Sequence, residues 1–490
     1  MLTVVTVTIA SICLALTLVW LMWKRRLRKY AHFKFSPTIP LLGHALDFPY
    51  DPHKLLLYIM EQMQMHGDTF IIWPGTSPLI LTADPKWAEA LLSSQELITK
   101  SDFYDFLHEW LGFGLLTSTG KKWKRRRRMI TPTFHFTILN EFVQVFEEQS
   151  NVLVNKLRKL ADNDGAIDVQ KPIGLCALDI ICETAMGVKL NAQELSSSPY
   201  VQAVSNMTAH VQRRQRNPFL WPDLLYNMTK YGQEYKKDLN TLLEFTQKVI
   251  EKRITDRNSQ EKQLEKSVNK VAFLDMLLDL YLKKEIDLQG VQEEVDTFMF
   301  EGHDTTAVAM SWAIYMIGLH PEVQKKIHKE IDSLSESSLS LIERVCSLKY
   351  LEASIKEALR MWPSVPIYGR YINKDTFIDG TLVPCGSSLL VLPQGLHRNK
   401  AYWHDPDDFK PERFLSEDFA NRHPYQYVPF SAGPRNCVGQ KFALLEEKIV
   451  LYNILKNFSI ETVQPIEDVD VHAEIILRSN NGLWVKFYKR

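Results

Sequence analysis

The chain begins with a run of uncharged residues, Leu2 to Trp23, that consists mainly of Val, Ile, Leu, Ala and Thr. A run of about 20 apolar residues is long enough to span a bilayer as a helix. The basic cluster Lys24 to Lys29 follows directly. Because Lys and Arg beside a membrane segment stay in the cytosol, we expect the N-terminus in the lumen and everything from Tyr30 onward on the cytosolic side.

A cleaved signal peptide is the alternative for this first segment. Signal peptides normally carry their positive charge before a shorter apolar stretch, and they end at a site of small residues. Here no Lys or Arg precedes the apolar run, and no such site follows it. We therefore expect a retained membrane anchor.

Charge and cysteine content narrow the class of protein further. The 58 basic and 58 acidic side chains cancel, so the chain as a whole has no attraction for nucleic acid or anionic lipid. The six cysteines are scattered without a C-x-x-C pair, which does not indicate a disulfide framework and fits a reducing compartment. They are Cys13, Cys176, Cys182, Cys346, Cys385 and Cys437.

A stiff segment separates the anchor from the rest of the chain. Two prolines forbid helix continuation between Ser36 and Pro40, which predicts a linker. Two apolar runs at 70–73 and 79–82 flank Pro74-Gly75-Thr76-Ser77 and predict a β-hairpin. We divide the chain into an anchor (1–23), a basic and proline-containing linker (24–44) and a main domain (45–490).

The main domain changes character at Arg360. From about Pro85 to Leu359, apolar residues recur at three- and four-residue spacing, which predicts helices, with an exposed loop at 258–262. Beyond Arg360 prolines are frequent, a short strand is expected at 388–392, and helix returns from Gln440 to Phe458. The pattern predicts one domain that is mainly α with small β-sheets (α+β).

Cys437 lies in a glycine-containing loop, FSAGPRNCVG, at residues 430–439. Gly433 and Gly439 permit tight backbone geometry. The helix expected from Gln440 would direct its positive end at the sulfur and lower the pKa of the thiol. Taken alone, a cysteine in such a loop is more commonly buried and inert.

The complete loop resembles the haem-binding signature of the cytochrome P-450 superfamily, which it matches at Phe430, Gly433, Arg435, Cys437 and Gly439. The resemblance covers nearly the whole chain and implies the cytochrome P-450 fold. It also implies haem b with Cys437 as the axial thiolate ligand of the iron, and a contact between Phe430 and the cofactor. Arg435 is close enough to pair with a haem propionate.

A second pair of motifs fits the same family. Glu357 and Arg360 form an E-x-x-R sequence and lie about one helical turn apart, so they can pair. In the family this pair also holds an arginine of the next motif beneath the haem. Here that arginine is Arg413, in the sequence P-E-R-F. On its own, an E-x-x-R sequence does not indicate this family, because many helices carry such pairs.

Further cations are expected near the haem carboxylates. Trp123 and Arg127 share a helical face and resemble the family's W-x-x-x-R, while Arg370 occupies the place of another propionate partner. The basic run 121–128 admits a nucleic-acid interpretation, but it stands alone and no nucleic-acid-binding motif accompanies it. We interpret its remaining Lys and Arg as a solvated face that docks an acidic redox partner.

A long helix is predicted from Leu288 to Leu319, with a length of about 45–50 Å. Gly302, Thr305 and Thr306 can loosen its hydrogen-bond ladder and admit water and dioxygen. Asp304 with Thr305 resembles the family's acid–alcohol pair, which delivers protons. Outside this family context, such residues would indicate a polar face or a kink.

The same segment resembles family four of the cytochromes P-450, the fatty-acid ω-hydroxylase group. Glu301 stands where most relatives carry a small residue. In that group the matching glutamate can form an ester with a haem methyl, in a self-catalysed cross-link. A buried carboxylate beside an apolar porphyrin edge is otherwise costly, so a covalent bond or a strong partner is expected. Burial without linkage is the alternative.

The resemblance implies a haem-thiolate monooxygenase that hydroxylates a lipophilic substrate, a fatty acid at or near its ω end. Electrons would come through NADPH–cytochrome P-450 reductase, with cytochrome b5 as an additional donor, at the endoplasmic reticulum membrane. The alternatives are a xenobiotic or other lipid hydroxylase, a haem-thiolate isomerase or dehydratase, and a non-catalytic haem carrier. Side chains around 102–116 and 204–220 are expected to line the access route, and no nucleic acid is expected as a partner.

Overall fold

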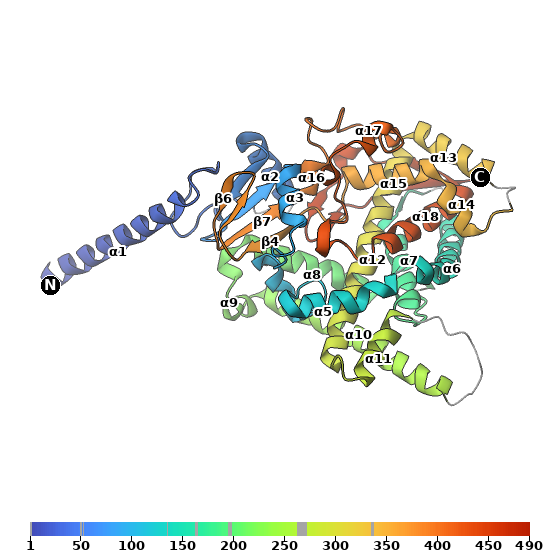
Figure 1. The fold of residues 1–490 in the computed structure, drawn as a ribbon, viewed down its shortest axis with the longest axis horizontal. Coiled ribbons are helices and arrows are strands. Elements are labelled where there is room, and N and C mark those ends of the chain that lie inside the picture. The colour runs from blue at the N-terminus through green and yellow to red at the C-terminus, as the bar shows by residue number, and fades with distance from the viewer. Residues whose placement is uncertain are drawn as a thin grey trace.

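The computed structural model describes residues 2–49, 51, 53–134, 136–161, 165–194, 198–261, 272–334 and 338–490. Figure 1 shows a helical body with a smaller β region on the side from which the N-terminal helix projects. The helices are α1 (Leu2–Arg28), α2 (His53–His66), α3 (Pro85–Leu92), α4 (His108–Leu111), α5 (Gly120–Ile130), α6 (Phe136–Ala161), α7 (Gln170–Thr184), α8 (Pro199–Arg216), α9 (Asp223–Asn227), α10 (Lys230–Glu261), α11 (Phe273–Leu282), α12 (Leu288–Leu319), α13 (Pro321–Ser333), α14 (Leu341–Ser347), α15 (Lys349–Met361), α16 (Pro393–Leu396), α17 (Glu417–Ala420) and α18 (Gln440–Asn457).

Small sheets complete the fold, as the sequence predicted. The largest has the strand order β1-β2-β7-β4, in which β2 and β7 are parallel and the other pairs are antiparallel. The predicted hairpin is confirmed as β1 and β2, and the strand expected at 388–392 is β7. The strands are β1 (Thr69–Ile72), β2 (Leu79–Thr82), β3 (Ile167–Asp168), β4 (Tyr368–Ile372), β5 (Thr376–Ile378), β6 (Thr381–Val383), β7 (Ser387–Val391), β8 (Phe458–Thr462), β9 (Val471–Ala473), β10 (Leu477–Ser479) and β11 (Trp484–Lys489).

Helix α12 runs through the centre of the body, with the bounds predicted from the sequence. It packs against α7, α10, α15 and α18, which surround it in Figure 1. A helix that is apolar on nearly all sides can be stable in water only when other elements cover it. Helix α12 therefore organises the large hydrophobic core, and the predicted helix from Gln440 is confirmed as α18, one of its neighbours.

The N-terminal helix α1 continues through the basic cluster to Arg28. Its most apolar stretch has a mean hydropathy of 2.4 and is entirely exposed, so α1 meets the length and composition of a membrane anchor. Beyond that stretch, Trp23 packs edge-on against Trp73 at 5.3 Å, and the hydroxyls of Tyr30 and Ser387 are 3.1 Å apart. The proline-containing segment is thus packed on the sheet region; Thr38, for example, accepts a hydrogen bond from Trp23.

The exposed loop predicted at 258–262 is wrong for the residues that the structure describes. Residues 258–261 continue α10, whereas Lys262 lies outside the described residues. Gln260 and Glu261 have high helix propensity, so this polar segment is compatible with the last turn of a solvated helix. Ser259 also donates to the Thr255 carbonyl one turn earlier, at 2.9 Å.

The E-x-x-R pair is confirmed as a fully buried ion pair. Arg360 Nε and Nη2 lie 2.8 and 2.9 Å from the two carboxylate oxygens of Glu357. Arg413 Nε lies 3.2 Å from Glu357 Oε1, and Arg360 Nη1 also donates to the carbonyls of His397 and Pro406. This network ties α15 to the proline-rich segment that leads to the Cys437 loop.

Arg360→Ala should destabilise the protein strongly. It would remove the two-pronged partner of Glu357 and leave this buried carboxylate with the longer Arg413 contact, and breaking such a buried pair costs about 3–5 kcal/mol. The loss should appear as a lower urea midpoint in circular dichroism. Lys326→Ala is the matched control, because it removes a half-exposed cation 2.6 Å from Glu412, and exposed pairs contribute about 0–1 kcal/mol. Equal midpoints for the two variants would contradict the importance of this network.

Candidate active site

The loop that carries Cys437 is fixed by its own backbone. The Cys437 N–H donates to the Phe430 carbonyl at 2.9 Å, which closes the loop immediately before α18. Gly433 has a φ of 67°, and a Cβ there would overlap the carbonyl oxygen of Leu92 in α3's final turn. Only glycine accommodates both conditions, so the loop can lie tightly against α3.

The Cys437 sulfur borders a cavity that the protein only partly encloses, and the side chain is exposed to this space. Burial, reinforced by the nearby Glu301 carboxylate, raises the pKa of this thiol to about 12, although the Gly439 N–H and Arg127 lower it. The prediction of a lowered pKa is therefore wrong for the protein alone. The sequence indicates the helix end beside Cys437, but it does not indicate how deeply the sulfur is buried. A bound metal cation would supply the missing positive charge and deprotonate the thiol.

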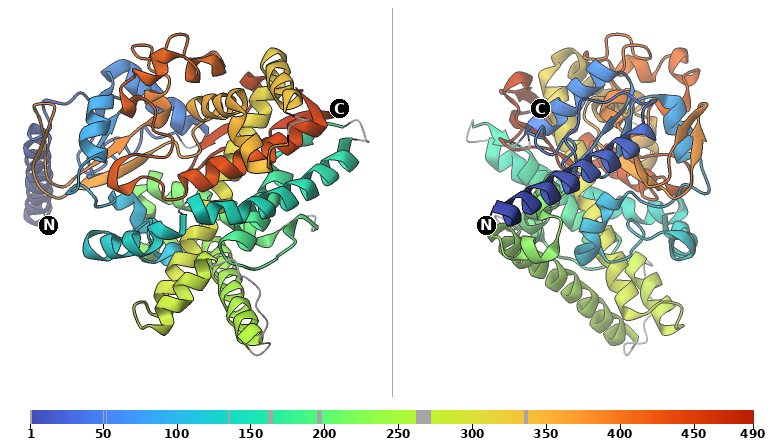
Figure 2. Two further views of the ribbon diagram at one scale, coloured as in Figure 1. Left: turned by 45° about the vertical axis from the view of Figure 1, so that its right-hand side comes forward. Right: turned by 90° about the vertical axis from the view of Figure 1, so that its left-hand side faces the viewer.

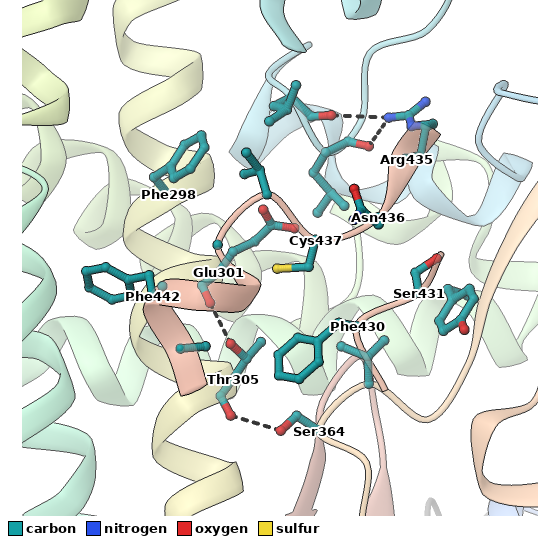
Figure 3. Close-up of a pocket in the computed structure, with 18 of the residues that line it drawn as sticks. Phe298, Glu301, Thr305, Ser364, Phe430, Ser431, Arg435, Asn436, Cys437 and Phe442 are labelled. Carbon is teal, nitrogen blue, oxygen red and sulfur yellow. Dashed lines mark hydrogen bonds between the residues drawn. The ribbon is translucent and has the colours of Figure 1, made fainter. Parts of the chain in front are cut away.

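The cavity is a mostly apolar slot between the Cys437 loop and α12. Figure 3 shows Phe298, Phe430 and Phe442 around it, with the Glu301 carboxylate and the Cys437 sulfur directed inward. Further apolar side chains complete the walls; they are Leu115, Leu116, Trp123, Phe134, Ile181, Leu359, Val365, Val438 and Ala443.

Basic side chains outnumber acidic ones at the cavity. The basic residues are Lys100, Arg127, Arg370 and Arg435; the acidic residues are Glu301 and Glu447. Burial raises the pKa of Glu447 to about 8 and that of Glu301 to about 7, so neither carboxyl fully balances these cations near neutral pH. Burial and the neighbouring arginines lower the pKa of Lys100 well below its ordinary value. Such a set of cations fits a ligand that brings its own carboxylates.

Haem satisfies all of these features. Its macrocycle would fill the apolar slot, its iron would meet the Cys437 sulfur, and its propionates would meet the cations. The structure brings together the predicted residues Trp123, Arg127, Arg370, Phe430, Arg435, Cys437, Glu301 and Thr305 at this one cavity.

Arg435 and Arg127 are already held by the protein. The Arg435 guanidinium donates to the carbonyls of Ile98, Leu115, Leu116 and Ser118 at 2.6–3.1 Å and stacks on Trp123, 4.8 Å from the ring centre. Burial and the neighbouring Arg370 lower its pKa to about 9.

Arg127 donates to Asn436, at 2.6 Å to both the backbone and the side-chain oxygen. Both arginines thus clamp the Cys437 loop as well as contributing charge.

Asp304 and Thr305 face different surroundings. Thr305 lines the cavity and donates to the Glu301 carbonyl at 2.7 Å, one turn back as predicted. Asp304 is buried outside the cavity lining and is paired with Arg478 of β10. Consecutive helical residues point about 100° apart, which allows the alcohol to face the cavity while the acid faces β10.

Gly302 has a packing role that the sequence did not reveal. A Cβ at this position would clash with the side chain of Ile181 in α7, which crosses α12 here. The predicted local loosening of the helix is limited to side-chain bonds, because α12 is continuous through this region. Thr306 donates to the Gly302 carbonyl at 3.1 Å and lies 3.3 Å from Glu446 Oε1.

Sequence reasoning missed Lys100. This residue lies between elements, forms an isolated bridge with Arg370 of β4, and matches no motif or helical spacing. In the sequence, Lys100 differs from its immediate neighbours only by its positive charge. Pairing with β4 places Lys100 at the cavity. Pairing between residues so far apart in the chain cannot be predicted from the local sequence.

Lys100→Met should weaken haem retention. Losing one hydrogen bond to a charged group costs about 1.5–3 kcal/mol, or roughly a tenfold to hundredfold loss in affinity. The rate of haem transfer to excess apomyoglobin measures this change. Lys124→Met is the matched control, because Lys124 is exposed on α5. Equal transfer rates for Lys100→Met and the wild type would remove Lys100 from the haem site.

Comparison with known proteins agrees with this geometry. The family model described as Cytochrome P450 matches residues 34–486. Human cytochrome P450 4V2 is 44% identical over 480 residues, covering 94% of this chain and 91% of the relative, and the rat protein of that name is 43% identical over the same shares. Drosophila melanogaster cytochrome P450 4c3 is 39% identical over 490 residues, covering 95% of this chain and 91% of that one. The chain therefore belongs to family four of the cytochromes P450, which are haem-thiolate monooxygenases that work with a redox partner and a small-molecule substrate.

Proposed function

We propose that this protein hydroxylates a fatty acid at or near its ω end. The observation that carries the proposal is an apolar channel that continues from the haem cavity. The two share Tyr104, Leu116, Glu301, Thr305, Val365 and Tyr368. The channel reaches Phe48, Leu55 and Ile72, which lie in or next to α2 and β1, on the side of the body from which α1 projects. An elongated apolar space suits an aliphatic chain whose end is presented at Thr305.

Cys437 is proposed as the axial ligand, with Phe430 and Trp123 against the macrocycle and Arg127, Arg370 and Arg435 near its propionates. When bound, the haem supplies dioxygen activation and the insertion of one oxygen atom into a C–H bond. The chain's own contribution is to hold the substrate end, exclude bulk water and move protons.

Proton delivery is proposed for Asp304 and Thr305. The Thr305 hydroxyl is the member of the pair that borders the cavity, so it would give its proton there. Asp304 would resupply it, after its carboxyl turns away from Arg478. A positioned acid–base group typically contributes about 10²–10⁴-fold in rate.

Glu301 is proposed as the point of an ester link to a haem methyl. Burial raises the pKa of this carboxyl, whereas Lys100 and Arg435 lower it, so Glu301 is a costly charge in the slot. The new C–O bond would replace one methyl C–H bond, a two-electron oxidation. Its oxidant would be the enzyme's own oxygen chemistry during turnover. The link would also fix the haem relative to the channel.

The proposed setting is the endoplasmic reticulum membrane, with one membrane span and the catalytic body in the cytosol. Helix α1 and its basic end support this topology. The proposed electron donor is NADPH–cytochrome P-450 reductase, with cytochrome b5 as a further donor. Lys121, Lys124, Arg125 and Arg128 are exposed on α5 and form a basic face that suits an acidic partner.

The reaction is tested by reconstitution with NADPH, the reductase and a saturated fatty acid. Wild-type protein should give a product that mass spectrometry locates at or near the terminal carbon. Thr305→Ala should consume NADPH but release mainly peroxide, with product lowered by about 10²-fold or more. Product from xenobiotics alone would favour the alternative hydroxylase, and conversion without NADPH would favour an isomerase. Unchanged coupling in Thr305→Ala would remove its proton role.

Glu301→Ala tests the cross-link. After turnover, wild-type protein should keep part of its haem through acid and organic solvent, and intact mass should equal polypeptide plus haem. The variant should release all of its haem and shift oxidation inward along the chain, since the cofactor is less firmly placed. Glu447→Gln is a suitable control, because it changes a second carboxyl at the same cavity. Fully extractable haem in turned-over wild type would exclude the ester.

A further inference from the structure

One wall of the channel is polar within otherwise apolar surroundings. The apolar lining includes Ile59, Leu79, Leu81, Leu107, Phe300, Ile367, Leu390, Ile475 and Ile476. Polar side chains also border it, among them Ser101, Gln212, Gln215 and Glu474, which lie apart from those shared with the haem cavity. We call these four residues the polar wall. A polar atom in an apolar channel is costly unless a protein group, a water molecule or a ligand pairs with it.

Gln212 lines the channel and keeps one buried acceptor unpaired among the residues described by the structure. This residue of α8 is 3% exposed, and its Nε2 donates to the Ala473 carbonyl at 2.6 Å. That bond fixes the orientation of the amide, because an oxygen in the same place would face another oxygen. Gln212 Oε1 is buried and has no hydrogen-bond partner within the described residues. The atom left for a ligand is therefore an acceptor.

Ser101 adds a second buried polar atom to the same channel. It is 1% exposed, directly precedes the 3-10 helix η1 (Asp102–Leu107), and does not cap it. Its hydroxyl oxygen has no hydrogen-bond partner in the part of the chain that the structure describes. The Gln215 amide donates to the Phe103 carbonyl at 3.0 Å, which holds η1 against α8 near Gln212.

Glu474 makes the polar wall rich in acceptors. It follows Ala473, the residue that orients Gln212, and its Oε2 accepts from the Thr208 hydroxyl at 2.7 Å. Thr208 is one helical turn before Gln212, so the carboxyl and the amide lie on one side of α8. A carboxylate of a ligand would meet oxygen atoms here and be repelled, whereas a neutral O–H group can donate to them.

Arg216 is a cation on the same channel, in contrast to the acceptors of the polar wall. It lines the same channel one turn after Gln212 and donates to the Pro49 carbonyl at 3.2 Å. A carboxylate in the channel would be drawn to this cation and away from the acceptors. The affinity of a fatty acid should therefore depend little on Gln212.

We propose that Gln212 Oε1 and Ser101 Oγ form a subsite for the hydroxyl group of a neutral lipid alcohol. The inference rests on the proposed function in one respect, that the channel holds the substrate. It adds neutral chains that carry an O–H donor to the fatty acids of the proposed function. The hydroxyl would take the place of water on the polar wall, so the alcohol gains a hydrogen bond that an ether cannot make.

The test compares three probes of equal chain length, 1-dodecanol, dodecyl methyl ether and dodecanoate. Each is titrated into the haem-loaded protein, and binding is followed by the shift of the haem absorbance band. Wild-type protein should bind the alcohol about 5–10-fold more tightly than the ether, the value of one neutral hydrogen bond. Gln212→Leu should abolish this preference and leave ether and dodecanoate affinity within about twofold, because neither depends on the lost acceptor.

Gln202→Leu is the matched control, because it makes the same change at an exposed position of α8 and should keep the preference. Ser101→Ala is the second variant, should Gln212→Leu fail to load haem, and it should reduce the preference by half or more. Equal affinity for alcohol and ether in the wild type overturns the subsite, as does a preference that survives both variants. Absence of binding by all three probes overturns it as well.

The two proposals fail separately. An alcohol preference without NADPH-dependent product would leave the subsite in place and reject the proposed reaction. Terminal product without an alcohol preference would do the reverse.

Discussion

The arrangement of the molecule depends on an unbalanced set of charges buried around one apolar slot. Lys100, Arg127, Arg370 and Arg435 meet there with little acidic compensation from the protein. Buried cations without a counter-charge oppose folding. Ligand carboxylates that bind only the folded state therefore stabilise it. Haem binding and stability are therefore linked in this chain. The same charges explain why the Cys437 loop is clamped by two arginines, because each also satisfies backbone carbonyls.

The sequence predicted what is contiguous or periodic. The Cys437 loop, the E-x-x-R pair, α12 and the first hairpin could all be recognised because their residues lie within one short segment or one spacing. Lys100 and the Asp304–Arg478 pair could not, since each depends on contacts between residues far apart in the chain. The Cys437 pKa was predicted in the wrong direction for a related reason: a helix end is visible in a sequence, but the amount of surrounding protein is not.

Helix α12 directs side chains that are close in sequence toward different parts of the structure. Glu301 and Thr305 are four residues apart and share the cavity, whereas Asp304 points toward β10. Helical geometry places i and i+4 on one face and i+1 on another. Two residues that are adjacent in sequence can therefore lie in different surroundings. The pairing with Arg478 holds the Asp304 carboxylate away from the cavity.

The packing of Trp23 and Tyr30 onto the sheet has a consequence for encounters at a membrane. A domain on a loose tether samples all orientations, and most collisions with a second membrane protein are then unproductive. Here the helix that would enter the bilayer ends in an aromatic cluster with Trp73, so the body inherits the tilt of α1. With α1 in a bilayer, the basic face on α5 would stand at one height above the lipid. An encounter with a membrane-bound electron donor would then require only lateral diffusion and rotation about a single axis.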